Sequence, residues 1–168
     1  AMERASDRLQ SLAIMKERRL VQDFLREIGT DSGLAVYGEN EVREALRQGR
    51  LRQVIISEEL DLYAVRIACS SCKYAEDKTV KGRDMLIFER GLYQQRCPSC
   101  NAQTLYVEER QSVIEEFSKL AEEKGVTLEI ISSRTEEGQM LYKSFGGIAG
   151  ILRHITHSEA SLSGSSTR

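Results

Sequence analysis

Apolar residues recur at two different spacings along the chain, and these spacings predict which segments are helical and which are extended. From about Arg4 to Ile28 they return every three or four positions among alternating charges, which predicts one long amphipathic helix. Shorter stripes of the same kind predict helices that end at Gly49 and Gly125. A further helix is expected where Ser133 and Glu136 have the spacing of a capping box.

Nearly continuous apolar runs at Leu51–Ile56 and Val126–Ile131 follow two of these helices. Such strands are typical of parallel neighbours that are covered on both faces of a sheet. Shorter apolar runs at Leu34–Val36 and Ile148–Ile155 complete a candidate sheet. The pattern therefore predicts an α/β fold, arranged as a three-layer α/β/α sandwich.

The alternation of helix and strand patterns breaks between Leu60 and Thr104. In this stretch Tyr63–Ile67 and Met85–Phe88 have the pattern of short strands that flank polar turns. We interpret the stretch as an inserted β minidomain. It contains every cysteine of the chain, in C-x2-C-x24-C-x2-C spacing: Cys69, Cys72, Cys97 and Cys100.

Two C-x-x-C pairs can place four thiolates around a single tetrahedral ion, so this spacing favours one structural Zn2+ per chain. A closed shell of four thiolates leaves no position for water or substrate, which makes a catalytic zinc the weaker interpretation. Two disulfides and a redox-active dithiol are the alternatives. Nothing in the sequence marks secretion, however, and redox C-x-x-C motifs occur singly at the start of a helix.

Composition narrows the classes of function. The formal net charge is −2, although 30% of the residues are charged and 40% are hydrophobic. This near balance argues against a protein that grips nucleic acid by bulk positive charge. No run is long and apolar enough to span a membrane, and no signal-peptide pattern is present. We therefore expect no membrane partner and a cytoplasmic location.

The residues offer no catalytic constellation. With the four cysteines assigned to metal, no thiol remains to act as a nucleophile, and the only histidines are His154 and His157. Gly146 and Gly147 lack the spaced glycines and lysine of a phosphate loop, and they follow a helix rather than a strand. We expect the chain not to be an enzyme.

These patterns give the following organisation. Residues 1–13 extend the first helix beyond the core, and residues 158–168 form a polar tail that we expect to be disordered. The α/β/α core comprises residues 14–62 and 105–157, and the zinc-binding minidomain comprises residues 63–104.

Several runs of residues closely resemble the end of the class-1 peptide-chain release factors of archaea and eukaryotes. The clearest are Thr135–Gln139, which reads TEEGQ, and Phe145–His154, which reads FGGIAGILRH. Segments near Ile14, Tyr37 and Ile56 agree in the same order. The cysteine quartet resembles the archaeal branch of the family in particular.

This resemblance implies the third, C-terminal domain of such a factor, with the fold of the kink-turn-binding ribosomal proteins and an inserted zinc-binding minidomain. In the family, two other domains read the stop codon and carry the Gly-Gly-Gln loop, and neither is in this sequence. The family's third domain instead binds the translational GTPase that delivers the factor, and it faces the ribosome-recycling ATPase. Partner binding is therefore the expected role, with the ribosome as a partner of the full-length factor.

The resemblance also implies a set of partner-binding residues. A Gly-Ile-Leu-Arg-Tyr motif implicated in GTPase contact corresponds to residues 150–154, where a histidine replaces the tyrosine, and the first helix is the other implicated region. The candidates are Arg18, Arg19, Gly150, Ile151, Leu152, Arg153 and His154. Whether Ile151 and Leu152 lie in the core or at an interface stays open, because a strand normally buries one of two neighbours.

The alternative function is a kink-turn RNA-binding module of the ribosomal-protein type. The segment Gly38–Val42 resembles the glycine-led helix start with which those proteins clasp RNA, and a helix N-terminus offers backbone donors to phosphate. Glu39 and Glu41 would repel a phosphate backbone, however, and no lysine precedes the glycine. Partner binding is thus the favoured hypothesis.

Overall fold

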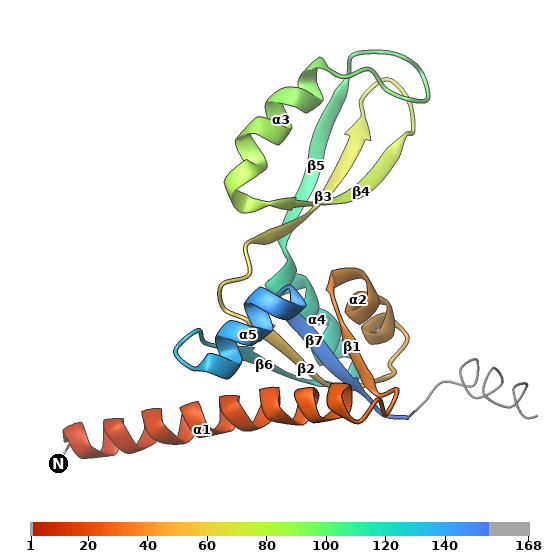
Figure 1. Cartoon of the computed structure of the whole chain (residues 1–168). Coiled ribbons are helices and arrows are strands. Elements are labelled where there is room, and N and C mark those ends of the chain that lie inside the picture. Colours follow the sequence, from red (N-terminus) through yellow and green to blue (C-terminus); the bar gives the residue numbers. More distant parts are fainter. Residues whose placement is uncertain (1, 155–168) are drawn as a thin grey trace, which may run out of the picture. The chain divides into compact units, whose positions relative to one another are not determined.

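A computed structural model describes the backbone of residues 2–154 and the side chains from residue 5 onward. The chain forms two compact units (Figure 1), one of residues 1–60 and 120–168 and a second of Asp61–Lys119 that is inserted into the first. The inserted unit is wider than the expected 63–104. The tail expected at 158–168 lies outside the described residues.

The first unit is built on a four-stranded sheet with the order β1-β7-β2-β6. Its strands are β1 (Ala35–Tyr37), β7 (Ile148–Leu152), β2 (Leu51–Ser57) and β6 (Thr127–Ile131). The two long apolar runs, β2 and β6, pair in parallel as predicted. Strand β7 lies between β1 and β2 and is antiparallel to both, so the sheet is mixed.

Helices cover both faces of this sheet, as a three-layer arrangement requires. On one face lie α1 (Met2–Gly29) and α5 (Glu136–Phe145), and on the other lies α2 (Glu39–Arg47) together with the end of α4 (Val113–Lys124). The mixed α/β class predicted from sequence is confirmed. The first half of α1 extends past the edge of the sheet, and its apolar side chains Leu9, Leu12 and Met15 are exposed.

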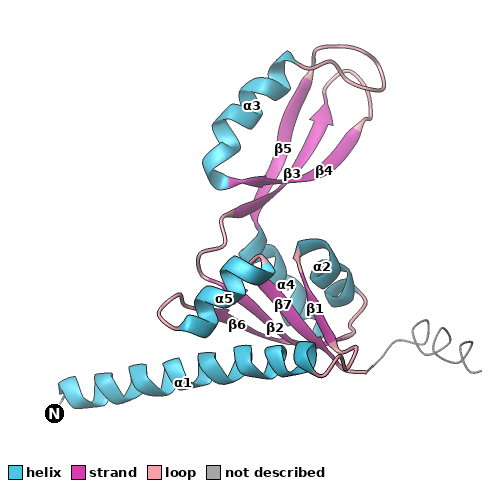
Figure 2. Cartoon of the chain, in the orientation of Figure 1, coloured by secondary structure: helices cyan, strands magenta, loops and turns pink. Residues whose placement is uncertain are grey.

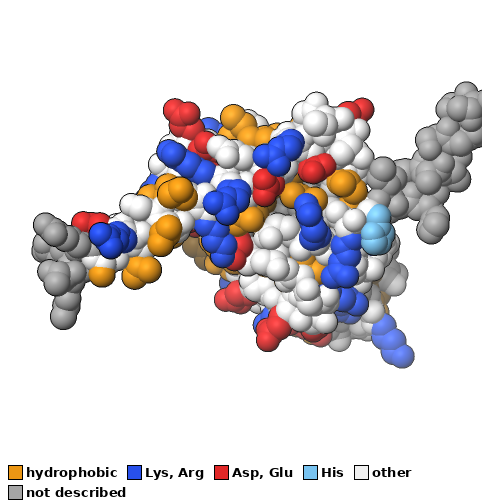
Figure 3. All heavy atoms as spheres, turned by 90° about the horizontal axis from the view of Figure 1, so that it is seen from below, with side chains coloured by type: hydrophobic (Ala, Val, Ile, Leu, Met, Phe, Trp, Pro, Cys, Tyr) orange, Lys and Arg blue, Asp and Glu red, His pale blue; other side chains and the backbone are white. Residues whose placement is uncertain are grey.

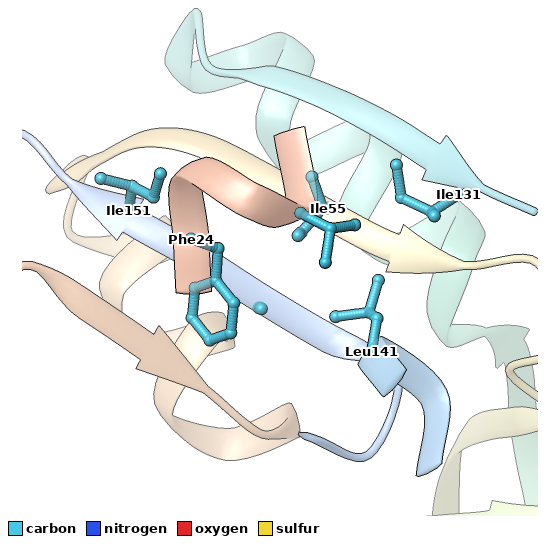
Figure 4. Close-up of a cluster of buried hydrophobic side chains, with 7 residues drawn as sticks. Phe24, Ile55, Ile131, Leu141 and Ile151 are labelled. Atoms are coloured by element: carbon cyan, nitrogen blue, oxygen red, sulfur yellow. The ribbon is translucent and has the colours of Figure 1, made fainter. Parts of the chain in front are cut away.

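The continuous apolar run of β2 follows from this double coverage. Side chains of a strand point alternately to the two faces, so Ile55 packs under α1 and α5 while Val54 and Ile56 point to the other face; all three are buried. Figure 4 shows the cluster on the α1 and α5 side. Its buried members are Val21, Phe24, Ile55, Ile131, Leu141, Ala149 and Ile151.

The start of α5 differs in detail from the predicted capping box. The N-cap residue is Thr135 rather than Ser133, and its hydroxyl accepts a hydrogen bond from the Gly138 N–H at 2.9 Å. Gly138 has to be a glycine here, because a Cβ atom would lie 2.0 Å from the backbone oxygen of Ser132. The TEEGQ run therefore has a local structural explanation as a helix start.

The second unit is an antiparallel three-stranded sheet with the order β4-β3-β5, covered on one face by a helix (Figure 2). Its elements are β3 (Leu62–Cys69), β4 (Ala75–Lys81), the short 3-10 helix η1 (Gly82–Asp84), α3 (Met85–Gln94) and β5 (Leu105–Ser112).

Two sequence expectations for this unit were wrong. Met85–Phe88 is not a strand but the first turn of α3, which turns Met85, Phe88 and Leu92 toward the sheet. A four-residue window does not separate the two periodicities, because a short apolar run suits either element. In addition, β5 pairs along β3 and so belongs to this sheet rather than to the sheet of the first unit.

Among the described residues, no helix combines the length and the apolar character needed to cross a lipid bilayer.

Candidate metal centre and partner-binding surface

The fold of the second unit brings the four predicted metal ligands together. Cys69 ends β3, Cys72 lies in the turn before β4, and Cys97 and Cys100 lie in the loop between α3 and β5. The four sulfur atoms all lie within 4.8 Å of one another. Pairing of β3 with β5 places Cys69 opposite Leu105, directly after the second cysteine loop, which explains why pairs so distant in sequence meet.

The distances between the sulfurs suit coordination rather than disulfide bonding. All four cysteines are free. The Cys69 and Cys100 sulfurs are 3.6 Å apart, and so are those of Cys72 and Cys97. A disulfide bond would be about 2.05 Å long, whereas a tetrahedral zinc with bonds of about 2.3 Å separates its sulfur ligands by roughly 3.8 Å.

Backbone donors surround the sulfurs. In each C-x-x-C pair the N–H two residues after the first cysteine donates to its sulfur at 3.4 Å, from Ser71 to Cys69 and from Ser99 to Cys97. Tyr74 donates to the Cys72 sulfur in the same way at 3.4 Å. N–H groups that point at sulfur favour the thiolate over the thiol, and thiolates are the form that binds metal.

The pKa values of Cys69 and Cys100 are shifted in opposite directions. A hydrogen bond with the Thr104 hydroxyl, at 3.0 Å, outweighs burial and lowers the pKa of Cys69 to about 6. At Cys100 a hydrogen bond from the Ala102 N–H acts to lower the pKa, but burial and the three neighbouring thiols outweigh it and raise the pKa to about 11. Four thiolates at this spacing repel one another. A bound dication removes that conflict, so the donor set fits a metal ion.

The predicted partner-binding residues divide into exposed and buried groups. Arg18 and Arg19 are exposed on α1, where an ion pair of 3.6 Å links Arg18 to Glu137 of α5. Arg153 and His154 follow β7 and are exposed as well. Figure 3 shows the face along which α1 runs, with Lys and Arg side chains spread among apolar and acidic ones.

The remaining candidates belong to the interior. Ile151 and Leu152 are each only 3% exposed, and Gly150 is buried. A Cβ atom on Gly150 would lie 2.8 Å from the Leu51 side chain and 3.1 Å from the Gln53 backbone oxygen. These three residues therefore hold β7 in place, and of the candidates from Gly150 to His154 only Arg153 and His154 are exposed.

Arg153 fixes the end of the strand as well as exposing a charge. Its Nε donates to the backbone oxygen of Leu51 at 3.0 Å, and its N–H donates to the backbone oxygen of Arg50 at 2.8 Å. The side chain is thus oriented before any partner arrives, which lowers the entropic cost of using it at an interface.

Sequence reasoning missed a contact that locks α1 to the loop before α5. A carboxylate oxygen of Glu17 accepts hydrogen bonds from the Ser132 hydroxyl at 2.7 Å and from the Ser132 N–H at 3.3 Å. The two residues are far apart along the chain, and a glutamate on a charged helix gives no local signal of such a role. The contact keeps the exposed part of α1 aligned with the core.

The start of α2, which the RNA-binding alternative requires, carries negative charge. Gly38 precedes the helix with φ +93°, and Glu39 and Glu41 occupy its first turn. Arg43 pairs with Glu39 at 2.8 Å and is therefore engaged within the helix. The negative charges complement the positive end of the helix dipole, and they would repel a phosphate group.

The sequence of the chain is similar to a family profile and to the sequences of individual proteins. A family profile described as eRF1 domain 3 matches residues 14–156. Peptide chain release factor subunit 1 of Methanocaldococcus jannaschii is 46% identical over 157 residues, which cover 93% of this chain and 37% of that protein. The chain thus spans little more than a third of the length of that relative.

Two solved structures extend the comparison to the fold. The C-terminal domain of a peptide chain release factor from Methanosarcina mazei is similar with a TM-score of 0.79 and 31% identity, and 92% of each chain is covered. Dom34 of S. cerevisiae, a translation termination-like factor, is similar in fold with a TM-score of 0.51 and 19% identity, over 90% of this chain and 31% of that chain.

Proposed function

Since the chain belongs to the eRF1 domain 3 family, we propose that it is the partner-docking C-terminal domain of a peptide chain release factor. Its partners in this proposal are the elongation-factor-like translational GTPase, the ribosome-recycling ATPase and, for the full-length factor, the ribosome. Such work takes place in the cytoplasm.

One observation carries the docking proposal: the two implicated regions belong to the same unit, where α1 packs against β7, and both have exposed basic residues. Arg18 and Arg19 are exposed on α1, and Arg153 and His154 are exposed directly after β7. Arginine suits such a surface because its planar, always-charged head forms paired hydrogen bonds with carboxylates. Arg153 is the strongest candidate, since its side chain is already anchored to Leu51.

The proposal also covers the second unit, which we expect to be stabilised by a structural metal ion. Cys69, Cys72, Cys97 and Cys100 would hold one structural Zn2+. When bound, the ion supplies a cross-link between the two cysteine loops and neutralises their thiolates. The chain's own contribution is to aim backbone N–H donors at all four sulfurs.

We further propose that the domain itself catalyses nothing. The two glycines that follow α5 support this, because Gly146 and Gly147 adopt φ values of +73° and +82° and end the helix, with the Gly147 N–H donating to the Leu141 oxygen at 2.9 Å. This is the work of a helix C-cap rather than of a catalytic loop.

The test is binding of the purified chain to the translational GTPase, measured by calorimetry with Arg153→Glu beside the unaltered chain. Charge reversal at an interface should weaken binding by at least about tenfold. The substitution also removes the hydrogen bond to Leu51, so thermal unfolding of the variant is measured to verify that its fold persists.

Arg66→Glu serves as the matched control. This arginine is exposed on the sheet of the second unit, which contains none of the residues proposed to dock, and its ion pairs there are with surface carboxylates. It should leave GTPase affinity unchanged. No binding by the unaltered chain, together with salt-sensitive binding to a kink-turn RNA, would instead establish the RNA-binding alternative.

A further inference from the structure

Helix α3 has a second face that the second unit does not use. Met85 and Leu92 are buried against the sheet, and Phe88 is half-buried beside them. At 100° per residue the opposite side of the helix carries residues 86, 87, 90, 93 and 94, with residue 83 just before it. This outer face is formed by Arg83, Leu86, Ile87, Arg90, Tyr93 and Gln94.

The apolar residues of the outer face are unusually open to solvent. Ile87 is 74% exposed and Leu86 is 72% exposed, the highest values among the large hydrophobic side chains of the described residues. Tyr93, one to two turns further along, is 54% exposed. Single exposed apolar residues are ordinary, but adjacent ones on one helix face are typical of interaction sites.

The two charged residues of the outer face are both basic, and its remaining polar residue, Gln94, is neutral. Arg83 and Arg90 are exposed, and within the described part of the chain no ion pair joins either guanidinium to a carboxylate. Two acids close by in the fold are engaged elsewhere: Glu89 pairs with Arg110, and the Asp61 carboxylate accepts a hydrogen bond from the backbone N–H of Arg83. The face thus combines aliphatic and aromatic groups with two arginines that form no ion pair with any described residue.

We propose that the outer face of α3 is a docking site for an acidic, amphipathic segment of a partner protein. Leucine, isoleucine, tyrosine and arginine together are the groups of a protein-binding surface, in which apolar anchors are framed by charge. The positive charge selects an acidic partner by complementarity. A nucleic acid fits less well, because two neighbouring aliphatic side chains gain little from contact with phosphate and sugar.

This site is separate from the docking surface proposed above. It lies on another unit and shares no residue with α1, Arg153 or His154. Failure of the GTPase-binding test therefore leaves it untouched, and the reverse holds as well.

The experiment selects partners by chemistry rather than by name. Phage displaying random 16-residue peptides are panned on the metal-loaded chain, with Ile87→Ser/Arg90→Glu as the counter-selecting bait. Both positions are exposed, so the variant should keep its fold, which thermal unfolding verifies. We expect enriched peptides with apolar residues at helical spacing and a net negative charge.

The selected peptide is then synthesised and titrated by fluorescence anisotropy. Its dissociation constant should rise by at least about tenfold for Ile87→Ser/Arg90→Glu and should also rise with salt, because part of the attraction is between exposed charges. The matched control is Tyr106→Ser/Arg66→Glu. These residues alternate with core residues on β5 and β3 and so face the other side of the sheet; affinity should not change.

Three outcomes overturn the proposal. Enriched peptides that are basic or neutral would contradict the charge argument. Peptides that bind the variant as tightly as the unaltered chain, or no enrichment at all, would show that α3 is not a docking face. Binding of a labelled single-stranded or hairpin RNA that is lost in Ile87→Ser/Arg90→Glu would assign the face to nucleic acid instead.

Discussion

The two units of the chain reach a folded state by different means. In the first, helices cover both faces of the sheet, and one face alone buries a cluster of seven apolar residues from two helices and three strands. In the second, one helix covers one face, and the other face carries surface charges, such as Arg66 with Asp77 and Glu108. Two of the cysteines, Cys69 and Cys97, are part of its buried cluster.

This difference in coverage of the two sheets indicates which interactions stabilise each unit. Hydrophobic burial grows with the size of a domain, and a unit as small as Asp61–Lys119 can bury only a thin core. Small units of this kind usually need a metal or a disulfide as a staple. We therefore expect the first unit to be stable by packing alone and the second to depend on its cysteine cluster.

The largest expected effect is that of removing metal. Chelation, or the change Cys97→Ser, should unfold the second unit and leave the first folded, because metal binding to such a site can supply about 10 kcal/mol of folding free energy. Hydrogen exchange read by mass spectrometry checks this peptide by peptide. Protection should vanish in β3 and β5 and persist in β2 and β7.

Elemental analysis supplies the control, with one zinc per chain expected before chelation and none after it. Loss of protection in both units at once would mean that the units are a single cooperative structure. Unchanged protection everywhere, or four titratable thiols and no metal in the freshly purified chain, would refute the metal proposal.

A smaller effect, confined to the other unit, is expected for Phe24→Ala. Phe24 is fully buried and packs edge-on against Phe145, with ring centroids 5.0 Å apart. Truncating such a side chain costs about 3–5 kcal/mol, from lost burial and the cavity left behind. Denaturant unfolding should show this loss for the first unit, with metal content unchanged. Phe24→Leu, which keeps most of the volume, should cost clearly less.

The fold was easier to predict from sequence in the first unit than in the second. Strand β2 is buried on both faces along most of its length, so its apolar run stands out. The apolar run of β6 is as clear in sequence, although this edge strand buries only Ile131, and the two strands pair in parallel as predicted. In the second unit the exposed apolar residues Leu86 and Ile87 obscure the helical stripe of α3. Secondary structure is predicted from the spacing of apolar residues that are buried in the core. Exposed apolar residues disturb that spacing.

The sites show a similar contrast. The cysteine spacing alone predicted that four thiols converge, and their sulfurs do so. The sequence could not show whether Ile151 and Leu152 lie in the core or at an interface. Neighbouring side chains of a strand point to opposite faces of the sheet, so only one of the two is buried when one face is open to solvent. Strand β7 lies between two other strands and beneath helices, so both residues are buried. That depends on contacts with distant segments, which the local sequence does not contain.

The smallest expected effect tests whether a local change stays within its unit. Thr135 caps α5 and is 3% exposed, and the first turn of the helix holds Glu136 and Glu137, whose charges complement the positive end of the helix. Thr135→Ala removes the hydrogen bond to the Gly138 N–H and should lower the unfolding free energy of the first unit by about 1 kcal/mol. Thr135→Ser keeps the hydroxyl and should recover most of that loss.

If the units are as independent as their different cores imply, zinc content and hydrogen exchange in β3–β5 stay at the level of the unaltered chain in both variants. A change there would show that α5 also supports the inserted unit.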